Sequence, residues 1–292
     1  MWALFHSSFV RSQLMRVVLV PAVVAALAAM SSRFFSRGAP PLAAAIAGLV
    51  VPAAFLAGYF AVYRDFTFPP ATVLSWVPWF IVALLIAAPV ASRAGGVSTR
   101  AALAILVAAS GTAALLWPIL EREPLSVALA TWALAAAAWS ALWVLADARG
   151  VGDAPFAAIA LIVSAGLAVV APLSGSILLG ELAATLAVAL VASLILNGLS
   201  KSPGLSGAGR ANIAFVLGAL VLDLRFYAGV GAGIVGAFVA SFALGLGAEF
   251  AVRRYRRAGP WAVLAPVLAA SIPVVAAVAI AFKAPSVGGG GY

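Results

Sequence analysis

Phe226–Glu249 reads FYAGVGAGIVGAFVASFALGLGAE and carries no charged residue between Phe226 and Ala248. About 20 apolar residues in a helix are enough to cross the hydrocarbon core of a bilayer. Every fourth residue of this stretch is small, and residues four apart share one face of a helix. The members of this ridge are Gly229, Gly233, Ala237, Ser241 and Gly245. Small side chains let helix backbones approach closely in lipid, so the stretch is predicted to be the central packing helix of a membrane bundle.

A neighbouring ridge of the same helix is also small throughout, and it consists of Ala228, Ala232, Gly236 and Ala240. Together the two ridges predict a broad, smooth groove. The glycines at 231, 233 and 236 also match the dinucleotide-binding pattern G-x-G-x-x-G. That pattern needs a preceding β-strand and a soluble βαβ unit, so we interpret these glycines as packing positions.

The composition of the whole chain is that of a membrane protein. Of its 292 residues, 65% are hydrophobic and only 9% are charged, whereas about a quarter of a soluble domain is charged. The predicted fold class is an all-α, polytopic membrane helix bundle that forms a single transmembrane domain over residues 1–292, with no soluble domain. The apolar runs predict ten spans, at 14–30, 41–63, 71–92, 99–120, 124–146, 154–173, 176–197, 206–222, 226–248 and 260–282.

The inventory of reactive side chains limits the chemistry that this chain can carry. It has no cysteine, and its single histidine, His6, lies in the N-terminal tail. Thiolate sites and histidine-rich metal sites are therefore excluded, and no cofactor or metal is expected. The net charge of +9 comes from basic residues that flank apolar runs, as at membrane surfaces, so nucleic acid is not an expected partner.

Orientation follows from the distribution of Lys and Arg in the short connections. With ten spans, eleven of the 17 basic residues fall on one side and six on the other. This bias places the first side in the cytoplasm and both termini outside. The expected location is a bacterial inner membrane.

Glu181 is the one acid that falls inside a predicted span, and Thr185 follows one helical turn later. An ionisable group in a span must face the bundle interior and find a partner. Two interpretations remain open: a proton or cation site, or a shallow glutamate stabilised by the helix N-terminus and by water.

Charged turns on the predicted outer side provide further candidates. Arg64, Asp65, Asp223 and Arg225 belong to two such turns, and Glu121-Arg122-Glu123 forms a third. They are either a polar entrance that attracts a cationic substrate or solvated residues that form weak surface pairs. Arg64 and Arg225 are both candidate counter-charges for Glu181.

A basic cluster follows the glycine-rich span on the predicted cytoplasmic side, and its members are Arg253, Arg254, Arg256 and Arg257. It is interpreted as a topology anchor or as a contact for anionic lipid, and Glu249 is placed to pair with Arg253 at i, i+4. The expected partners are the lipid bilayer and either a membrane partner protein or a second copy of the chain.

The leading functional hypothesis is a small-molecule or ion transporter, supported by the glycine-rich helix and by Glu181. The alternative is a non-transporting subunit or scaffold, supported by the scarcity of polar residues inside the spans. An enzyme is not expected, because the spans contain no pair of acids. The chain resembles the drug/metabolite transporter superfamily in length and span number alone, and it matches no motif of that family.

The predicted orientation is testable because the chain lacks cysteine. We expect an impermeant thiol reagent applied to intact cells to label a Thr67→Cys variant and to leave a Ser202→Cys variant unlabelled. The reverse pattern would invert the orientation, and labelling of both positions would change the span count.

Overall fold

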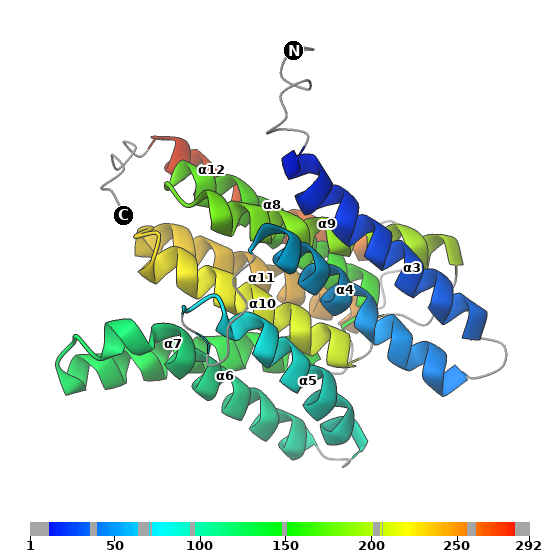
Figure 1. The fold of residues 1–292 in the computed structure, drawn as a ribbon, viewed down its shortest axis with the longest axis horizontal. Helices are drawn as coiled ribbons and strands as arrows, with labels where there is room; N and C mark the ends of the chain where they lie inside the picture. Colours follow the sequence, from blue (N-terminus) through cyan, green and yellow to red (C-terminus); the bar gives the residue numbers. More distant parts are fainter. Residues whose placement is uncertain are drawn as a thin grey trace.

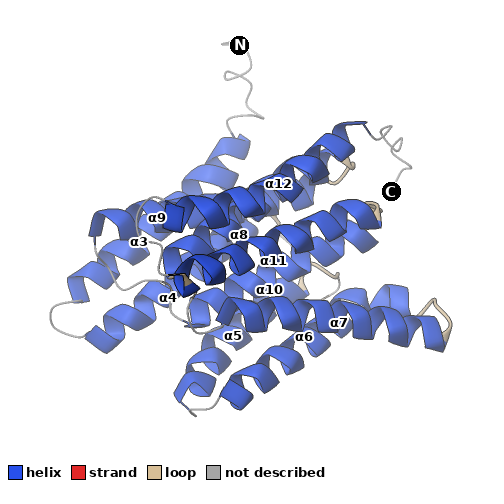
Figure 2. Cartoon of the chain, turned by 180° about the vertical axis from the view of Figure 1, so that it is seen from behind, coloured by secondary structure: helices blue, strands red, loops and turns tan. Residues whose placement is uncertain are grey.

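The computed structural model describes residues 12–35, 40–63, 70, 72–93, 97–147, 151–200, 205, 207–255 and 261–283. Over these ranges the chain is a bundle of long helices without β-strands (Figures 1 and 2), which confirms the predicted fold class. The helices in chain order are η1 (Met15–Leu19, π-helical), α3 (Val20–Phe35), α4 (Pro40–Val62), α5 (Trp76–Arg93), α6 (Val97–Leu120), α7 (Leu125–Asp147), α8 (Asp153–Leu173), α9 (Ile177–Ser200), α10 (Gly207–Phe226), α11 (Ala232–Arg254) and α12 (Trp261–Lys283).

Among the described helices, seven are long and apolar enough to cross a membrane. They are the first helix, Ser12–Phe35, together with α6, α7, α8, α9, α11 and α12, and shorter apolar helices cover Ile46–Val62 and Trp76–Ala87. The protein is therefore an integral membrane protein. Helix α10, which carries Arg210, Asp223 and Arg225, is not one of the seven.

The boundary between α10 and α11 differs from the prediction. Asp223 and Arg225, which were predicted to form a turn after a span ending at residue 222, lie in the last turn of α10. The chain then turns over residues 227–231, where Gly229 adopts the left-handed φ of 66° that favours glycine. Helix α11 therefore begins at Ala232 and not near Phe226, because its first predicted turn is used for the connection.

The central helix of the bundle is α10, and the prediction that gave this role to the glycine-rich stretch is wrong. Helix α10 packs against every helix from α4 to α9 and also against α11. Each residue from 211 to 217 is buried, so the helix has no lipid-facing stripe in that half. A helix enclosed by other helices needs less apolar surface than one that faces lipid, which explains why hydropathy understated its role.

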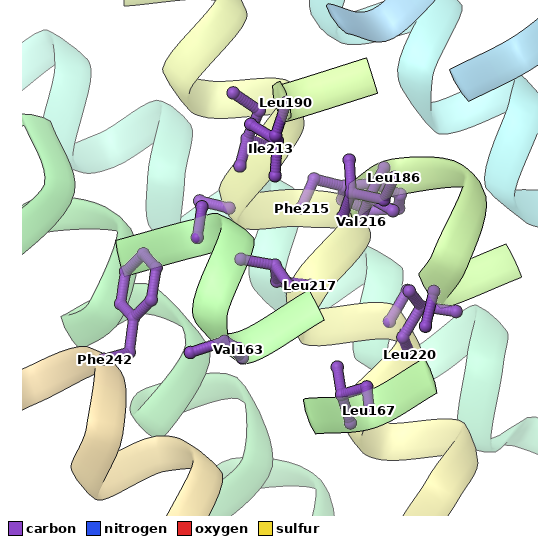
Figure 3. Packing of buried hydrophobic residues seen from close by; sticks show 14 of the residues in the cluster. Val163, Leu167, Leu186, Leu190, Ile213, Phe215, Val216, Leu217, Leu220 and Phe242 are labelled. Carbon is purple, nitrogen blue, oxygen red and sulfur yellow. The ribbon is translucent and has the colours of Figure 1, made fainter. Parts of the chain in front are cut away.

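Figure 3 shows how the core forms around α10. Its side chains, including Ile213, Leu217 and Leu220, meet residues of three neighbouring helices. These neighbours include Val163 and Leu167 of α8, Leu186 and Leu190 of α9, and Phe242 of α11. On the opposite face of α10, Phe215 stacks on Phe80 of α5 with ring centroids 5.2 Å apart, and it also contacts Trp139 of α7 at 5.1 Å.

The predicted ridge on α11 packs closely only in its second half. The Ser241 hydroxyl donates to the Ala270 carbonyl of α12 at 2.5 Å. A Cβ added to Gly245 would lie 2.9 Å from Ile159 Cγ1, so α8 also comes very close there. Ala237 is partly buried against the core. The prediction is wrong for Gly229, which precedes the helix, and for Gly233, which is exposed with open space around it.

This division predicts different effects for two glycines of α11. Gly245→Leu should destabilise the protein by about 1–3 kcal/mol or more, since the new side chain would have to displace Ile159 and Ala270. Gly247→Leu should leave stability nearly unchanged, because no atom lies within 4 Å of the position of its Cβ. Thermal unfolding of both variants in detergent would measure the difference. Equal melting temperatures would mean that α8 and α12 do not hold α11 at this point.

Candidate functional site

An apolar groove of about 490 Å³ lies among α7, α10 and α11. Its lining residues run from Thr131 to Leu142 on α7, from Ala214 to Phe226 on α10 and from Ala232 to Phe242 on α11, with Val163 of α8 behind them. Among the described lining residues, Thr131 and Arg225 are the only polar side chains besides the indole of Trp139. The volume falls within the range of about 300–1,000 Å³ that is usual for small-molecule sites.

Two glycines that line this groove have different surroundings. No atom lies within 4 Å of the position that a Cβ on Gly236 of α11 would take, so this glycine leaves open space, whereas a Cβ on Gly218 of α10 would clash with Nε1 of Trp139. Trp139 of α7 also lines the groove, and its indole N–H donates to the Ala214 carbonyl at 3.1 Å. Ala232 and Gly236 belong to the second ridge of small residues on α11, so this part of the ridge faces the groove instead of a neighbouring helix.

The groove extends through about half of a membrane thickness. Eleven residue steps from Thr131 to Leu142 correspond to ~16 Å along a helix, while the hydrocarbon core of a bilayer is ~30 Å thick. Arg225 lies at the end where α10 finishes and α11 begins. Its guanidinium donates to the Val230 carbonyl at 3.1 Å and lies 5.8 Å from the ring centre of Phe226. The apolar groove therefore ends at the positive charge of Arg225.

Asp223 lies two residues before Arg225 and is 2% exposed. Neither oxygen of its carboxyl group has a hydrogen-bond partner among the described residues. Its backbone carbonyl accepts hydrogen bonds from the N–H groups of Tyr227 at 2.9 Å and Ala228 at 3.1 Å. The sequence suggested a solvated turn residue, but the structure shows a buried acid.

Tyr227 connects Asp223 with the end of α6. Its hydroxyl donates to the Leu115 carbonyl at 2.7 Å. Burial and the nearby Asp223 carboxyl group raise the pKa of Tyr227 to about 12, while Arg122 acts in the opposite direction. The phenol therefore remains protonated and keeps its hydrogen bond at neutral pH.

Glu181 lies elsewhere, in the second turn of α9, and it is half-buried. Its nearby cation is Arg16 in the π-helical segment η1, so the suggestion that Arg225 supplies this charge is wrong. Thr185 is buried, but its hydroxyl donates to the Glu181 backbone carbonyl at 2.9 Å and so does not face the carboxyl group. Arg64 and Asp65 lie outside the described residues.

The opposite end of the bundle contains a cluster of paired charges. Arg210 of α10 forms an ion pair with Asp153 of α8 and donates to the Val151 carbonyl at 2.9 Å. Glu249 of α11 is 2% exposed and accepts from the Gly152 N–H at 3.2 Å and from Arg253 at 2.5 Å. The cluster ties the start of α8 to α10 and α11.

The arginines of the basic cluster therefore have different surroundings. The i, i+4 pair of Glu249 and Arg253 is confirmed, so Arg253 is engaged within the protein. Arg254 is exposed at the end of α11, and Arg256 and Arg257 lie outside the described residues. Contact of this cluster with anionic lipid stays a prediction.

Two further observations limit the chemistry of the bundle. No group of three or more His, Cys, Asp or Glu side chains that could hold a metal ion occurs in the part of the chain that the structure describes. Known protein families, curated proteins and solved structures show no match to this chain. The groove with Arg225, and Asp223 next to it, are therefore the features from which a function can be argued.

The buried cluster at the start of α8 predicts a stability effect. Glu249→Ala would leave the Gly152 N–H and Arg253 without their acceptor, which should cost about 1–3 kcal/mol. Glu123→Ala removes an exposed acid from the α6–α7 turn and should have little effect. Thermal unfolding of the two variants in the same detergent would test this. A Glu249→Ala protein as stable as Glu123→Ala would show that the cluster does not hold α8.

Proposed function

We propose that the protein is a transporter for amphiphiles that carry a hydrophobic tail and an anionic headgroup. The observation that supports this proposal is the apolar groove that ends at Arg225. The hydrophobic tail would lie along α7, α10 and α11, and the headgroup would bind the guanidinium.

The shape and lining of the groove favour this class of substrate over a small polar solute. A polar solute needs several hydrogen-bonding side chains along its path. Among the described residues the groove offers only Thr131 and Arg225, because the indole N–H of Trp139 is already bonded to Ala214. A lipid-like tail needs no hydrogen-bonding side chains. Its apolar contacts stabilise the bound state where the groove fits the tail more closely than bulk lipid does. The ~16 Å length matches the depth of one leaflet, so a bound amphiphile would keep its headgroup near the membrane surface.

Arg225 is suited to an anionic headgroup. Its fork of N–H donors can bind two oxygens of a phosphate or carboxylate together. One of its nitrogens is engaged by Val230, and the side chain is only partly exposed, which strengthens electrostatic attraction compared with open water. By the charge bias, this end of the bundle faces away from the cytoplasm, so the substrate would enter from the outer leaflet of a bacterial inner membrane.

A scaffold function is the second candidate, and the open space at Gly236 favours it. It would let a helix of a partner membrane protein approach α11 closely. Such a helix would not require Arg225, so the two functions predict different effects of changing this residue.

We expect purified protein to retain dioctanoyl phosphatidylglycerol in preference to dioctanoyl phosphatidylcholine, measured by native mass spectrometry. Gly236→Leu should reduce binding of both lipids about tenfold by filling the groove. Arg225→Gln should remove the preference for the anionic lipid, because a charge-assisted hydrogen bond contributes about 1.5–3 kcal/mol.

Matched controls are available within the same chain. Gly247→Leu introduces the same side chain on an exposed part of α11 outside the groove, and Lys283→Gln removes an exposed cation at the end of α12, outside both the groove and the basic cluster. Both should bind lipid as the unmodified protein does. Lipid binding without headgroup preference, and unaffected by Gly236→Leu, would contradict the transport proposal and leave the scaffold.

A further inference from the structure

Asp223 differs from the other acids whose side chains the structure describes. Asp153 and Glu249 are each paired with an arginine, and Glu181 is half-buried near Arg16. Glu121 and Glu123 are exposed. Asp223 is 2% exposed, and neither of its carboxyl oxygens has a hydrogen-bond partner among the residues that the structure describes. Burying a carboxylate that has no partner costs much free energy, whereas burying a neutral carboxylic acid is tolerated. The site therefore favours the protonated form of Asp223.

The position of Asp223 relates it directly to the groove. Leu222 and Phe226, on either side of it in the sequence, both line the groove, as does Arg225. Asp223 itself is not one of the lining residues, and its carboxyl group lies near enough to Tyr227 to raise the pKa of that phenol. A negative charge on Asp223 would therefore act on a headgroup held at Arg225 without touching it.

The short connection between α10 and α11 bonds to the backbone of Asp223 and to the side chain of Arg225. The N–H groups of Tyr227 and Ala228 donate to the backbone carbonyl of Asp223, and the Arg225 guanidinium donates to the Val230 carbonyl. Gly229 has a φ of 66° at the middle of this connection. A headgroup that draws the guanidinium away from Val230 would remove one of the bonds that hold the connection next to Asp223.

We propose that Asp223 is a proton-binding site that couples the protonation of the protein to the binding of the anionic headgroup at Arg225. This inference rests on the proposed function. With its proton in place, Asp223 leaves the positive charge of Arg225 available to the headgroup. When the proton leaves to water, the carboxylate competes with the headgroup for that charge and repels it. The protein thus binds the anionic headgroup and the proton together, and the two add no net charge to it.

Among the described residues, few other charged or titratable groups lie at this end on the elements that pack against α10. Helix α5 begins without one, α7 and α11 have none in their first turns, and α8 ends without one. On α9, Glu181 has Arg16 as its nearby cation. The remaining described groups are Tyr59 and Tyr63 of α4, Glu121, Arg122 and Glu123 of the α6–α7 turn, and Tyr227 itself, while Arg64 and Asp65 of the α4–α5 connection lie outside the described residues. The hydroxyls of the three tyrosines are all engaged, with Leu74, Thr72 and Leu115 respectively, and the two glutamates are exposed.

The test measures binding of dioctanoyl phosphatidylglycerol to the full chain in weakly acidic and in alkaline buffer. The phosphodiester of this probe stays ionised throughout, so a change in affinity reports the protein. We expect binding to weaken about tenfold in alkaline buffer, which is the effect of one nearby unit charge at partial burial. Asp223→Asn should bind as tightly as the protonated protein at both pH values. Asp223→Glu, which keeps a titratable group, should retain the pH dependence.

Several outcomes would overturn the inference and leave the proposed function intact. One is that the unmodified protein shows the same preference for phosphatidylglycerol at both pH values, and this measurement requires no variant. A second is an Asp223→Asn protein whose binding of phosphatidylglycerol depends on pH as that of the unmodified protein does. A third is binding that changes when choline replaces sodium in the buffer, which would make the binding depend on sodium and not on a proton. Loss of headgroup preference at every pH would instead remove the proposed function, and this coupling with it.

A measurement without lipid tests the protonation state separately. Infrared difference spectroscopy across an alkaline pH step should show the carbonyl band of a neutral carboxylic acid that disappears as the pH rises. The band should be absent from Asp223→Asn and present in Asp223→Glu. A protein without such a band would hold Asp223 ionised, which would overturn the proposal.

Discussion

Helix α10 is enclosed by other helices along most of its length, and this enclosure determines where polar groups can be placed in the bundle. Because α4 to α9 and α11 all pack on it, residues 211–217 face protein on every side. A helix in this position can carry Arg210, Asp223 and Arg225 near its ends without exposing them to hydrocarbon. The lipid-facing helices around it are apolar and carry little chemistry. Charged side chains therefore lie at the two ends of α10, which is the least apolar of the described helices.

The charged groups at the two ends of α10 are bonded differently. At one end, Arg210 and Asp153 form an ion pair, and Glu249 binds both Arg253 and the Gly152 N–H, so the acids of the cluster are matched. At the other end, no described residue bonds to the buried Asp223 carboxyl group, and Arg225 donates to the Val230 carbonyl. A matched cluster favours one fixed arrangement of α8, α10 and α11, while an acid without a described partner close to a cation can be stabilised by a ligand or a proton. The Asp223 end of α10 is thus the end at which binding would change the energies of the charged groups most.

The sequence anticipated much of the fold and part of the site. Long uncharged runs separated by prolines, glycines and charges predicted helices in the order in which they occur. The pair of Glu249 and Arg253 followed from their spacing in one helix. The burial of Asp223 was missed because charged residues in sequence usually mark a turn, whereas here the helix continues to Phe226 and Gly229 supplies the turn. Arg16 was missed as the counter-charge of Glu181 because the contact joins the first helix to α9, which are far apart in the chain.

By itself, the sequence determined that this protein is an all-α membrane bundle, because hydrophobicity, helix length and the need to satisfy backbone hydrogen bonds in lipid depend on local composition. It also showed that one helix carries two ridges of small residues. Only the tertiary structure decided which ridge packs and which faces space: Ser241 and Gly245 meet α8 and α12, while Gly236 faces the groove. It also decided that α10, not α11, is central and that the Asp223 carboxyl group has no hydrogen-bond partner in the described part of the chain. These outcomes depend on which helices become neighbours, and small residues look the same in sequence whether a helix, a lipid or a ligand lies against them.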